Sequence, residues 1–260
     1  MVLVGLVLGF ASACSSNAAE VSGAGGVGGG AIDVSLRGRD NNAGGTTDSG
    51  LVKAALPCPT DGPCRIMPLG DSITDGYNVP GGYRIKLWAE LQAAGADIDF
   101  VGSLQNGPDE LSDKDHEGHS GWRIDELDAI MSDTLTTYSP DIILVHIGTN
   151  DILNDADLET VEARFVSLLD TIAATSPNAA LVVAGLVPID GEVEDEMIVE
   201  FNDLASDLVE ERASEGMNIS FVDMHATVTL EDLADGIHPN EVGYDKMAEA
   251  WLSGLSTLRP

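Results

Sequence analysis

The chain has 260 residues, 43% of them hydrophobic, which suits one domain with a well-buried core and room for an appendage. With 44 acidic against 12 basic residues, the formal charge is −32. A field of that sign repels nucleic acids and anionic lipid head groups, so we expect no nucleic-acid partner. Solubility, or life in salty water, is the favoured interpretation of this charge, and attraction of cationic partners is the alternative.

Residues 1–14 form an apolar run that ends in small residues before a cysteine. The run is too short to span a bilayer and is typical of the hydrophobic part of a signal peptide. Ala11 to Cys14 resemble a bacterial lipobox, in which the cysteine is lipidated, although Ala11 replaces the preferred leucine. The alternative is an ordinary secretory signal that is cut near Ala13. We expect a lipid on Cys14 and an exported protein, either a periplasmic or outer-surface lipoprotein that meets the membrane only through this anchor, or a secreted one.

Residues 15–56 are rich in Gly, Ser, Ala and Asn and show no apolar period. Such a segment cannot bury enough surface to offset its ordering entropy, so it is predicted to be a flexible linker. Next, Cys58 and Cys64 flank a turn of Pro and Gly. In an exported protein two cysteines this close predict a disulfide, and a metal site would need more ligands than the loop offers.

From residue 65 onward, apolar strands alternate with amphipathic helices. Strands are expected over 65–70, 98–103, 141–148, 179–188 and 218–224, and helices over 82–95, 123–135, 157–174, 195–214 and 241–255. The continuous apolar strands are typical of a sheet that is covered on both faces. The pattern therefore predicts an α/β sandwich with a parallel sheet of about five strands over residues 57–260. Ligands of such folds bind at the carboxyl ends of the strands.

Chemically active residue types follow several of these strands. They are Ser72 in GDSIT, Gly102 in VGS, Asn150 in GTND, and Asp235 with His238 in DGIHPN. Because the carboxyl ends of parallel strands meet at one edge of a sheet, these segments are expected to converge. Together they supply the hydroxyl, imidazole, carboxylate and N–H donors that nucleophilic acyl transfer requires.

The chemistry assigns a role to each of these groups. The Ser72 hydroxyl is the expected nucleophile, and His238 the base that takes its proton and later protonates the leaving alcohol. Asp235, three residues before His238, can fix the tautomer of the imidazole. The backbone N–H groups of Ser72 and Gly102 and the side-chain amide of Asn150 are the candidates for the oxyanion hole.

All these segments occur in the order in which the SGNH hydrolases, a branch of the GDSL esterases and lipases, carry their sequence blocks, and the chain resembles that family over residues 65 to 258. The resemblance implies a flavodoxin-like three-layer α/β/α sandwich and a serine esterase. No G-x-S-x-G is present, so the elbow of the ordinary α/β-hydrolases is not expected. We expect a monomer without cofactor or metal.

Residues 115–127, DHEGHSGWRIDEL, resemble the EG-x-x-GW segment of SGNH carbohydrate esterases, especially carbohydrate esterase family 3, whose members are mainly acetyl xylan esterases. This resemblance implies that short acyl groups are removed from a carbohydrate such as xylan, or from another small ester. Within the fold, the alternative is a lysophospholipase or thioesterase. Outside the enzymes, it is a non-enzymatic surface lipoprotein, or a phosphate-binding module that would leave Asn150, Asp235 and His238 unexplained.

The remaining histidines and one tryptophan have less specific signals. His116 and His119 lie three apart in an expected loop, unlike the i, i+4 pair of a helical zinc site. His119 is predicted to shape the substrate pocket or to hold a loop, and Trp122 to stack on a sugar or to cap the core. His146 is predicted to be a hydrogen-bonded core residue, and His225 shows no evident role.

Overall fold

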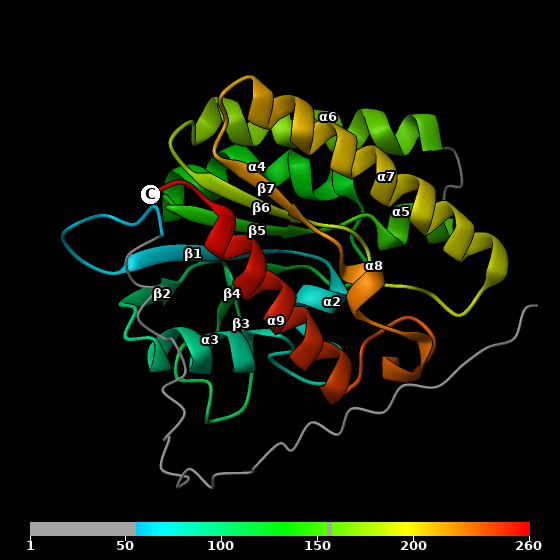
Figure 1. Ribbon diagram of the computed structural model, residues 1–260, viewed down its shortest axis with the longest axis horizontal. Helices are drawn as coiled ribbons and strands as arrows, with labels where there is room; N and C mark the ends of the chain where they lie inside the picture. Colours follow the sequence, from blue (N-terminus) through cyan, green and yellow to red (C-terminus); the bar gives the residue numbers. More distant parts are fainter. Residues whose placement is uncertain (1–55, 155–157) are drawn as a thin grey trace, which may run out of the picture. The chain divides into compact units, whose positions relative to one another are not determined.

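The computed structural model describes residues 56–154 and 158–260 (Figure 1). The predicted signal segment, Cys14 and residues 15–55 of the linker lie outside the described residues and stay predictions. Leu56, the last residue of the predicted linker, is only 8% exposed and packs into the hydrophobic core. The ordered domain thus begins at least one residue earlier than the sequence suggested.

Five parallel strands form the centre of the sheet, in the order β2–β1–β5–β6–β7. Their bounds are Cys64–Gly70 for β1, Ile98–Phe100 for β2, Ile142–His146 for β5, Ala180–Ala184 for β6 and Ile219–Val222 for β7. Every residue of β5 and β6 is buried, as expected for apolar strands that are covered on both faces. The predicted parallel α/β sheet is therefore confirmed.

Two short strands that the sequence did not predict extend the sheet at β1. β4 (Asp115–Gly118) runs parallel to β1, and β3 (Leu104–Gln105) pairs antiparallel with β4. β2 pairs with the first half of β1 and β4 with its last two residues. The prediction of a loop at residues 115–118 is thus wrong. Backbone pairing with β1 makes this segment a strand, although it is polar and lacks the apolar alternation that would have indicated one.

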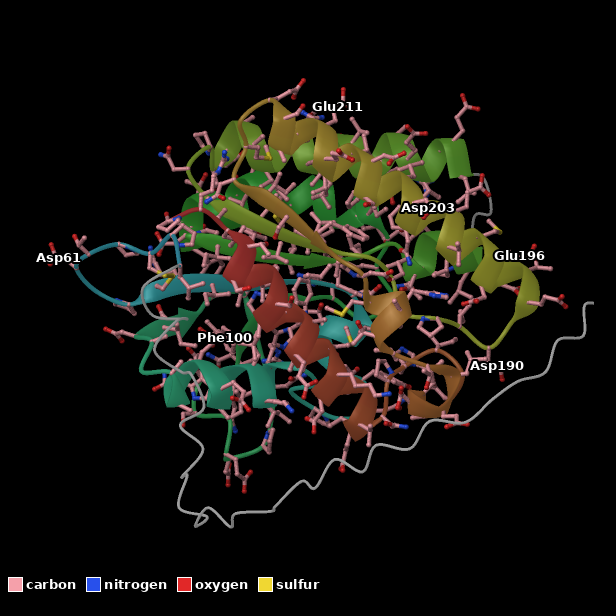
Figure 2. The ribbon with its side chains drawn as sticks, viewed as in Figure 1. Asp61, Phe100, Asp190, Glu196, Asp203 and Glu211 are labelled. Atoms are coloured by element: carbon pink, nitrogen blue, oxygen red, sulfur yellow. A yellow bond between two sulfur atoms is a disulfide. The ribbon has the colours of Figure 1, made fainter. Side chains whose placement is uncertain are left out.

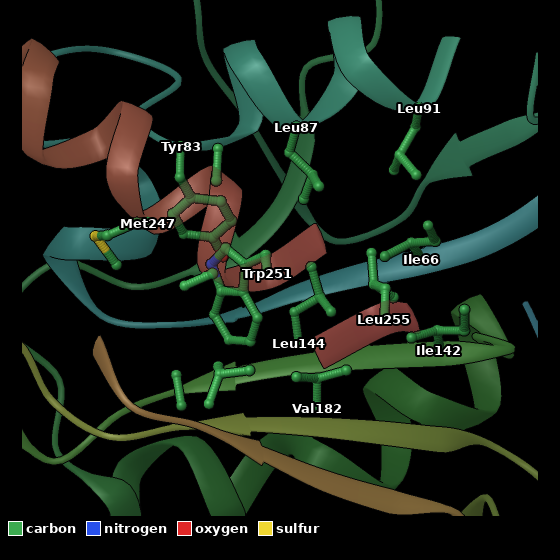
Figure 3. Packing of buried hydrophobic residues seen from close by; sticks show 14 of the residues in the cluster. Ile66, Tyr83, Leu87, Leu91, Ile142, Leu144, Val182, Met247, Trp251 and Leu255 are labelled. Atoms are coloured by element: carbon green, nitrogen blue, oxygen red, sulfur yellow. The ribbon is translucent and has the colours of Figure 1, made fainter. Parts of the chain in front are cut away.

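Helices cover both faces of the sheet and make three layers (Figure 1). On one face lie α3 (Arg84–Ala93) and α9 (Glu241–Thr257). On the other lie α4 (Ile124–Tyr138), α6 (Leu158–Thr175) and α7 (Glu192–Ser214). Figure 3 shows the hydrophobic core between the sheet and the face covered by α3 and α9, where side chains of these helices pack on β1, β5 and β6. The residues labelled there are Ile66, Tyr83, Leu87, Leu91, Ile142, Leu144, Val182, Met247, Trp251 and Leu255.

The surplus of negative charge lies on the outside of this sandwich. Residues 1–56 hold four acidic and three basic side chains, so 31 of the 32 excess negative charges belong to residues 57–260. Figure 2 shows Glu196, Asp203 and Glu211 along the outer side of α7, and all three are exposed. None of the helices in the described part of the chain is long and apolar enough to cross a membrane.

Short helices and turns occupy the carboxyl end of the sheet. They are α2 (Ser72–Asp75), α5 (Thr149–Asn154), α8 (Met224–Thr227) and the 3₁₀ turn η1 (Leu230–Asp232). At the opposite end, Cys58 is joined by a disulfide to Cys64, the first residue of β1, as expected.

Candidate active site

Ser72 begins the short helix α2, directly after β1. Asp71 caps this helix, because its Oδ1 accepts a hydrogen bond from the backbone N–H of Ile73 at 3.0 Å. β1 must end on a glycine, since a Cβ on Gly70 would lie 2.1 Å from the carbonyl oxygen of His146. Gly76 ends the helix with φ of 83°, a left-handed conformation that favours glycine. These residues hold the serine, half-buried, at the edge of the sheet.

The structure joins Ser72, His238 and Asp235 in one line of hydrogen bonds. Ser72 Oγ lies 2.9 Å from Nε2 of His238, and Nδ1 of His238 lies 2.9 Å from Oδ2 of Asp235. The other carboxylate oxygen of Asp235 accepts from the backbone N–H groups of His238, at 2.8 Å, and Ile237, at 3.1 Å. The nucleophile, base and acid that the sequence singled out therefore meet, over 166 residues of chain.

The carboxylate of Asp235 is held in its charged form. Its partial burial acts to raise the pKa, but hydrogen bonds from the His238 backbone, the His238 ring and Asn78 outweigh that effect and hold the pKa well below its usual range. An anionic Asp235 requires a proton on Nδ1 of His238, which leaves Nε2 free to accept the proton of Ser72.

Two residues that the sequence reasoning missed also contact this line. The side-chain amide of Asn78 donates to Oδ2 of Asp235 at 3.2 Å, and the ring of Tyr77 packs against the ring of His238 with 4.9 Å between centroids. The backbone N–H of Tyr77 donates to the carbonyl oxygen of Ser72 at 3.0 Å. Their only sequence signal is position, directly after the Gly76 that ends the nucleophile helix.

Asn150, a predicted oxyanion donor, lies in α5. Its Nδ2 donates to the carbonyl oxygen of Trp122 at 2.9 Å, which uses one of the two N–H bonds of the amide. The adjacent buried carboxylate of Asp151 accepts from the backbone N–H of Ile124 at 3.0 Å and from Arg164 at 3.0 Å. The start of α5 is therefore bonded twice to the segment around Trp122.

Gly102, the second predicted donor, follows β2 and packs closely on β4. A Cβ on Gly102 would lie 2.2 Å from the backbone carbon and oxygen of His116, so this close approach requires glycine. Its role as an oxyanion donor, like that of the Ser72 N–H, stays a prediction.

The sequence reasoning missed the buried carboxylate of Glu117, which lies between the surroundings of the two predicted oxyanion donors, Gly102 and Asn150. Glu117 on β4 accepts hydrogen bonds from the backbone N–H of Ser103 at 2.6 Å, from the Ser103 hydroxyl at 3.0 Å and from Nε2 of His119 at 2.7 Å. The His119 ring stacks on the Trp122 ring, with centroids 4.0 Å apart, and the Trp122 carbonyl holds Asn150. Ser103 is the residue after Gly102, so Glu117 is connected to the surroundings of both donors.

His119 and Trp122 both make structural contacts. The backbone N–H of His119 donates to the carbonyl oxygen of Gly70 at 2.9 Å, so His119 holds the loop after β4 to the end of β1. The partly buried Trp122 packs against the core under α4 and α6, in addition to its stacking on His119. Whether either touches substrate stays a prediction.

The other histidines take structural positions. His116 is buried beside β1, its Nδ1 accepts from the Gly118 N–H at 3.1 Å, and burial lowers its pKa to about 3. His146 is fully buried, and burial lowers its pKa to about 4. The prediction that His146 is hydrogen-bonded is wrong, because neither ring nitrogen has a partner among the described residues. His225 lies 3.1 Å from Oδ1 of Asp195 and ties α8 to α7.

A small pocket of about 220 Å³ adjoins the triad at Asp235. Apolar and acidic side chains line it, among them Leu153, Ile189, Asp190 and Glu194. Across residues 56–154 and 158–260, no group of three or more His, Cys, Asp or Glu side chains is placed to hold a metal ion.

The fold and the order of these segments define a GDSL/SGNH-type ester hydrolase, and comparison with known proteins agrees. Residues 69–246 match the GDSL-like Lipase/Acylhydrolase family, and the chain belongs to this family. Residues 69–246 are thereby assigned to a family of lipases and acylhydrolases.

Individual relatives are carbohydrate esterases or multidomain esterases. A family 3 carbohydrate esterase of Clostridium thermocellum has a similar structure, with a TM-score of 0.68, 36% identity and coverage of 74% of this chain and 94% of that one. A multidomain esterase of Ruminococcus flavefaciens is 35% identical over 75% of this chain, and an acetylxylan esterase of Xylanibacter ruminicola is 22% identical over 78% of it. The chain spans only 28% and 45% of those two relatives. The predicted resemblance to carbohydrate esterase family 3 is confirmed.

Proposed function

We propose that this chain is a serine esterase that removes acetyl groups from the hydroxyls of a polysaccharide such as xylan. The observation that carries the proposal is the hydrogen-bonded line from Ser72 through His238 to Asp235. The carbohydrate esterase and acetylxylan esterase relatives support the choice of substrate.

The proposed reaction runs in two halves on these residues. His238 takes the proton of Ser72 as Oγ attacks the acetyl carbonyl, and the resulting oxyanion receives hydrogen bonds from Asn150 and from the N–H groups of Ser72 and Gly102. When the intermediate collapses, His238 gives its proton to the departing sugar oxygen and leaves an acetyl ester on Ser72. Water then attacks this ester with His238 as base again, which releases acetate and restores the serine.

The relatives support deacetylation over the lysophospholipase or thioesterase alternative. Both the family 3 carbohydrate esterase of Clostridium thermocellum and the acetylxylan esterase of Xylanibacter ruminicola carry names of carbohydrate-directed esterases.

The deciding experiment measures acetate release from acetylated xylo-oligosaccharides, together with hydrolysis of p-nitrophenyl esters from acetyl to octanoyl. We expect the wild type to release acetate and to prefer acetyl esters. Ser72→Ala should lose nearly all activity while circular dichroism shows the native fold. Ser132→Ala, which removes an exposed hydroxyl on α4, is the matched control and should keep full activity.

Several results would contradict the proposal. A folded Ser72→Ala variant with near-normal turnover would show that Ser72 is not the nucleophile and that the proposed triad is wrong. A preference for octanoyl esters would favour the lipase alternative. Hydrolysis of p-nitrophenyl acetate without acetate release from any carbohydrate would keep the esterase and reject the polysaccharide substrate.

We also propose that the protein acts outside the cell, tethered through a lipid on Cys14. Sequence alone supports this, through the lipobox-like segment that ends at Cys14 and the Gly- and Ser-rich residues that follow it. Intact-mass analysis of protein from its native cells should find a lipid on an N-terminal cysteine. A mature chain without lipid would contradict the anchor.

A further inference from the structure

Tyr77 presents an unusually exposed aromatic ring beside the proposed catalytic base. Its exposed fraction is 63%, and it is the only aromatic among the large hydrophobic residues that are exposed in the described part of the chain. The ring centroid lies 4.9 Å from that of His238 and is tilted by 33° to it. Aromatic side chains are common in the lining of ligand sites, and a ring that is packed on the proposed base lies within reach of a bound substrate.

The turn that carries Tyr77 is fixed by contacts to all three residues of the triad. The backbone N–H of Tyr77 bonds to the Ser72 carbonyl at 3.0 Å, and its ring packs on His238. The next residue, Asn78, bonds to Asp235 at 3.2 Å. Gly76 makes the turn possible, because a Cβ there would lie 2.4 Å from the carbonyl oxygen of Val79. These contacts position the turn, and with it the Tyr77 ring, against the triad.

The proposed chemistry determines which part of a substrate this ring borders. His238 must protonate the leaving oxygen, so that oxygen has to come within hydrogen-bond reach of Nε2. The alcohol portion of the ester therefore lies beside the His238 ring, whereas the acyl oxygen lies toward the donors such as Asn150. An aromatic ring packed on His238 borders the alcohol portion.

We propose that Tyr77 is a platform on which the sugar ring of the leaving group stacks, and that it directs the enzyme toward acetylated carbohydrates rather than esters of small alcohols. The proposal rests on the proposed function and names the specificity residue of the same site. Sugar rings present C–H faces that pack on an aromatic ring, and tyrosine offers a large, rigid apolar surface for such contact. The hydroxyl of Tyr77 has no part in it.

The competing interpretation is that Tyr77 only supports the His238 ring. In that case its removal would weaken proton transfer for every ester alike. If Tyr77 is a platform, its removal should lower kcat/KM mainly for substrates whose leaving group is a ring. Substrates that share the acetyl group and differ in the alcohol separate the two.

The experiment compares Tyr77→Ala, Tyr77→Phe and the wild type on acetylated xylo-oligosaccharides, cyclohexyl acetate and ethyl acetate. For Tyr77→Ala we expect a rise in KM and an approximately tenfold fall in kcat/KM on the carbohydrate, the size of one aromatic contact. The loss on ethyl acetate should be several times smaller. Tyr77→Phe should behave like the wild type. Val199→Ala, which removes an exposed apolar side chain on α7, is the control.

Equal losses on carbohydrate and ethyl acetate would overturn the platform and favour a supporting role. No loss on either substrate, or a loss in Tyr77→Phe as large as in Tyr77→Ala, would also overturn it. If the wild type hydrolysed ethyl acetate but no carbohydrate acetate, the proposed function would fail separately. Cyclohexyl against ethyl acetate would then decide whether a ring-shaped leaving group depends on Tyr77.

Discussion

The carbonyl oxygen of Trp122 accepts a hydrogen bond from the side-chain amide of Asn150, with 2.9 Å between the oxygen and Nδ2. This bond orients the amide and leaves its second N–H for another acceptor. Preorganised donors of this kind stabilise an oxyanion without reorganising during the reaction. The orientation of Asn150 therefore depends on the loop between β4 and α4, far from it in sequence.

We expect Asn150→Ala to lower kcat by a factor of roughly 10² to 10³ with little change in KM, because the contact forms mainly in the transition state. Steady-state kinetics on p-nitrophenyl acetate measures both constants. The exposed Asn178→Ala, at the opposite end of the sheet, serves as the control. A rise in KM with unchanged kcat would place Asn150 in substrate binding instead.

A second prediction concerns Glu117, whose buried carboxylate accepts from Ser103 and from His119. Glu117→Gln removes the charge that strengthens these bonds and turns one acceptor into a donor, at a cost to stability of about 1 to 3 kcal/mol. Because Ser103 follows Gly102 and His119 stacks on Trp122, we expect kcat to fall by about tenfold or more, with KM nearly unchanged.

The exposed Glu210→Gln, on α7, is the matched control for Glu117→Gln. Thermal unfolding and steady-state kinetics should be measured on the same samples. If the melting temperature fell and kcat stayed at the wild-type value, Glu117 would be purely structural.

The sequence predicted most of the fold and the triad because their signals are local or ordered along the chain. The buried strand Ile142–His146 is a continuous apolar run, and Ser72, Asp235 and His238 lie in recognisable segments at strand ends. What it missed depends on tertiary contacts. β4 has no apolar alternation and exists because it pairs with β1, and Tyr77 gains its position from contacts with Ser72 and His238 that form only in the folded chain.

The third prediction concerns the triad as a unit. Because Ser72 and His238 share one proton transfer in the proposed reaction, we expect His238→Ala to be about as damaging as Ser72→Ala, and the double variant to be hardly worse than either. Kinetics on p-nitrophenyl acetate measures this, with His225→Ala as the control histidine outside the triad. Losses that multiply in the double variant would show that the two residues act independently.

The fourth prediction links Asp71 to the pH dependence of stability. Burial raises the pKa of its carboxyl from 3.8 to about 7. Between these values the folded state keeps a proton that the unfolded chain releases, so the contribution of Asp71 to the free energy of unfolding falls as pH rises through this window. Asp71→Asn keeps an oxygen for the Ile73 N–H and removes the titration.

The stability of Asp71→Asn relative to the wild type should therefore increase from about pH 4 to about pH 7 and change little above that, by a total on the order of 4 kcal/mol. Urea denaturation across this range measures the difference, with the exposed Asp133→Asn as the control. A difference that did not vary with pH would show that Asp71 titrates normally.

The last prediction follows from the charge around the site. Asp190 and Glu194 line the pocket beside Asp235, in a domain that carries 31 excess negative charges. A xylan that bears glucuronate is an anion, so its approach is opposed at low ionic strength. Salt screens such repulsion, with a Debye length of about 10 Å at 0.1 M and about 3 Å at 1 M. We expect kcat/KM on acidic acetylated xylan to rise with salt, and that on a neutral acetylated xylo-oligosaccharide to change much less.

Two substitutions on α7 separate local from global charge in this experiment. Glu194→Gln removes an exposed charge beside the pocket, and Glu211→Gln removes one in the last turns of the same helix (Figure 2 labels Asp190 and Glu211). Because screening weakens the effect of distant charges, Glu194→Gln should raise kcat/KM on the acidic substrate at low salt and flatten its salt dependence, whereas Glu211→Gln should do little. Equal salt responses on acidic and neutral substrates would refute the electrostatic argument. Equal effects of the two substitutions would mean that the net charge of the domain, rather than the acidic wall of the pocket, opposes the substrate.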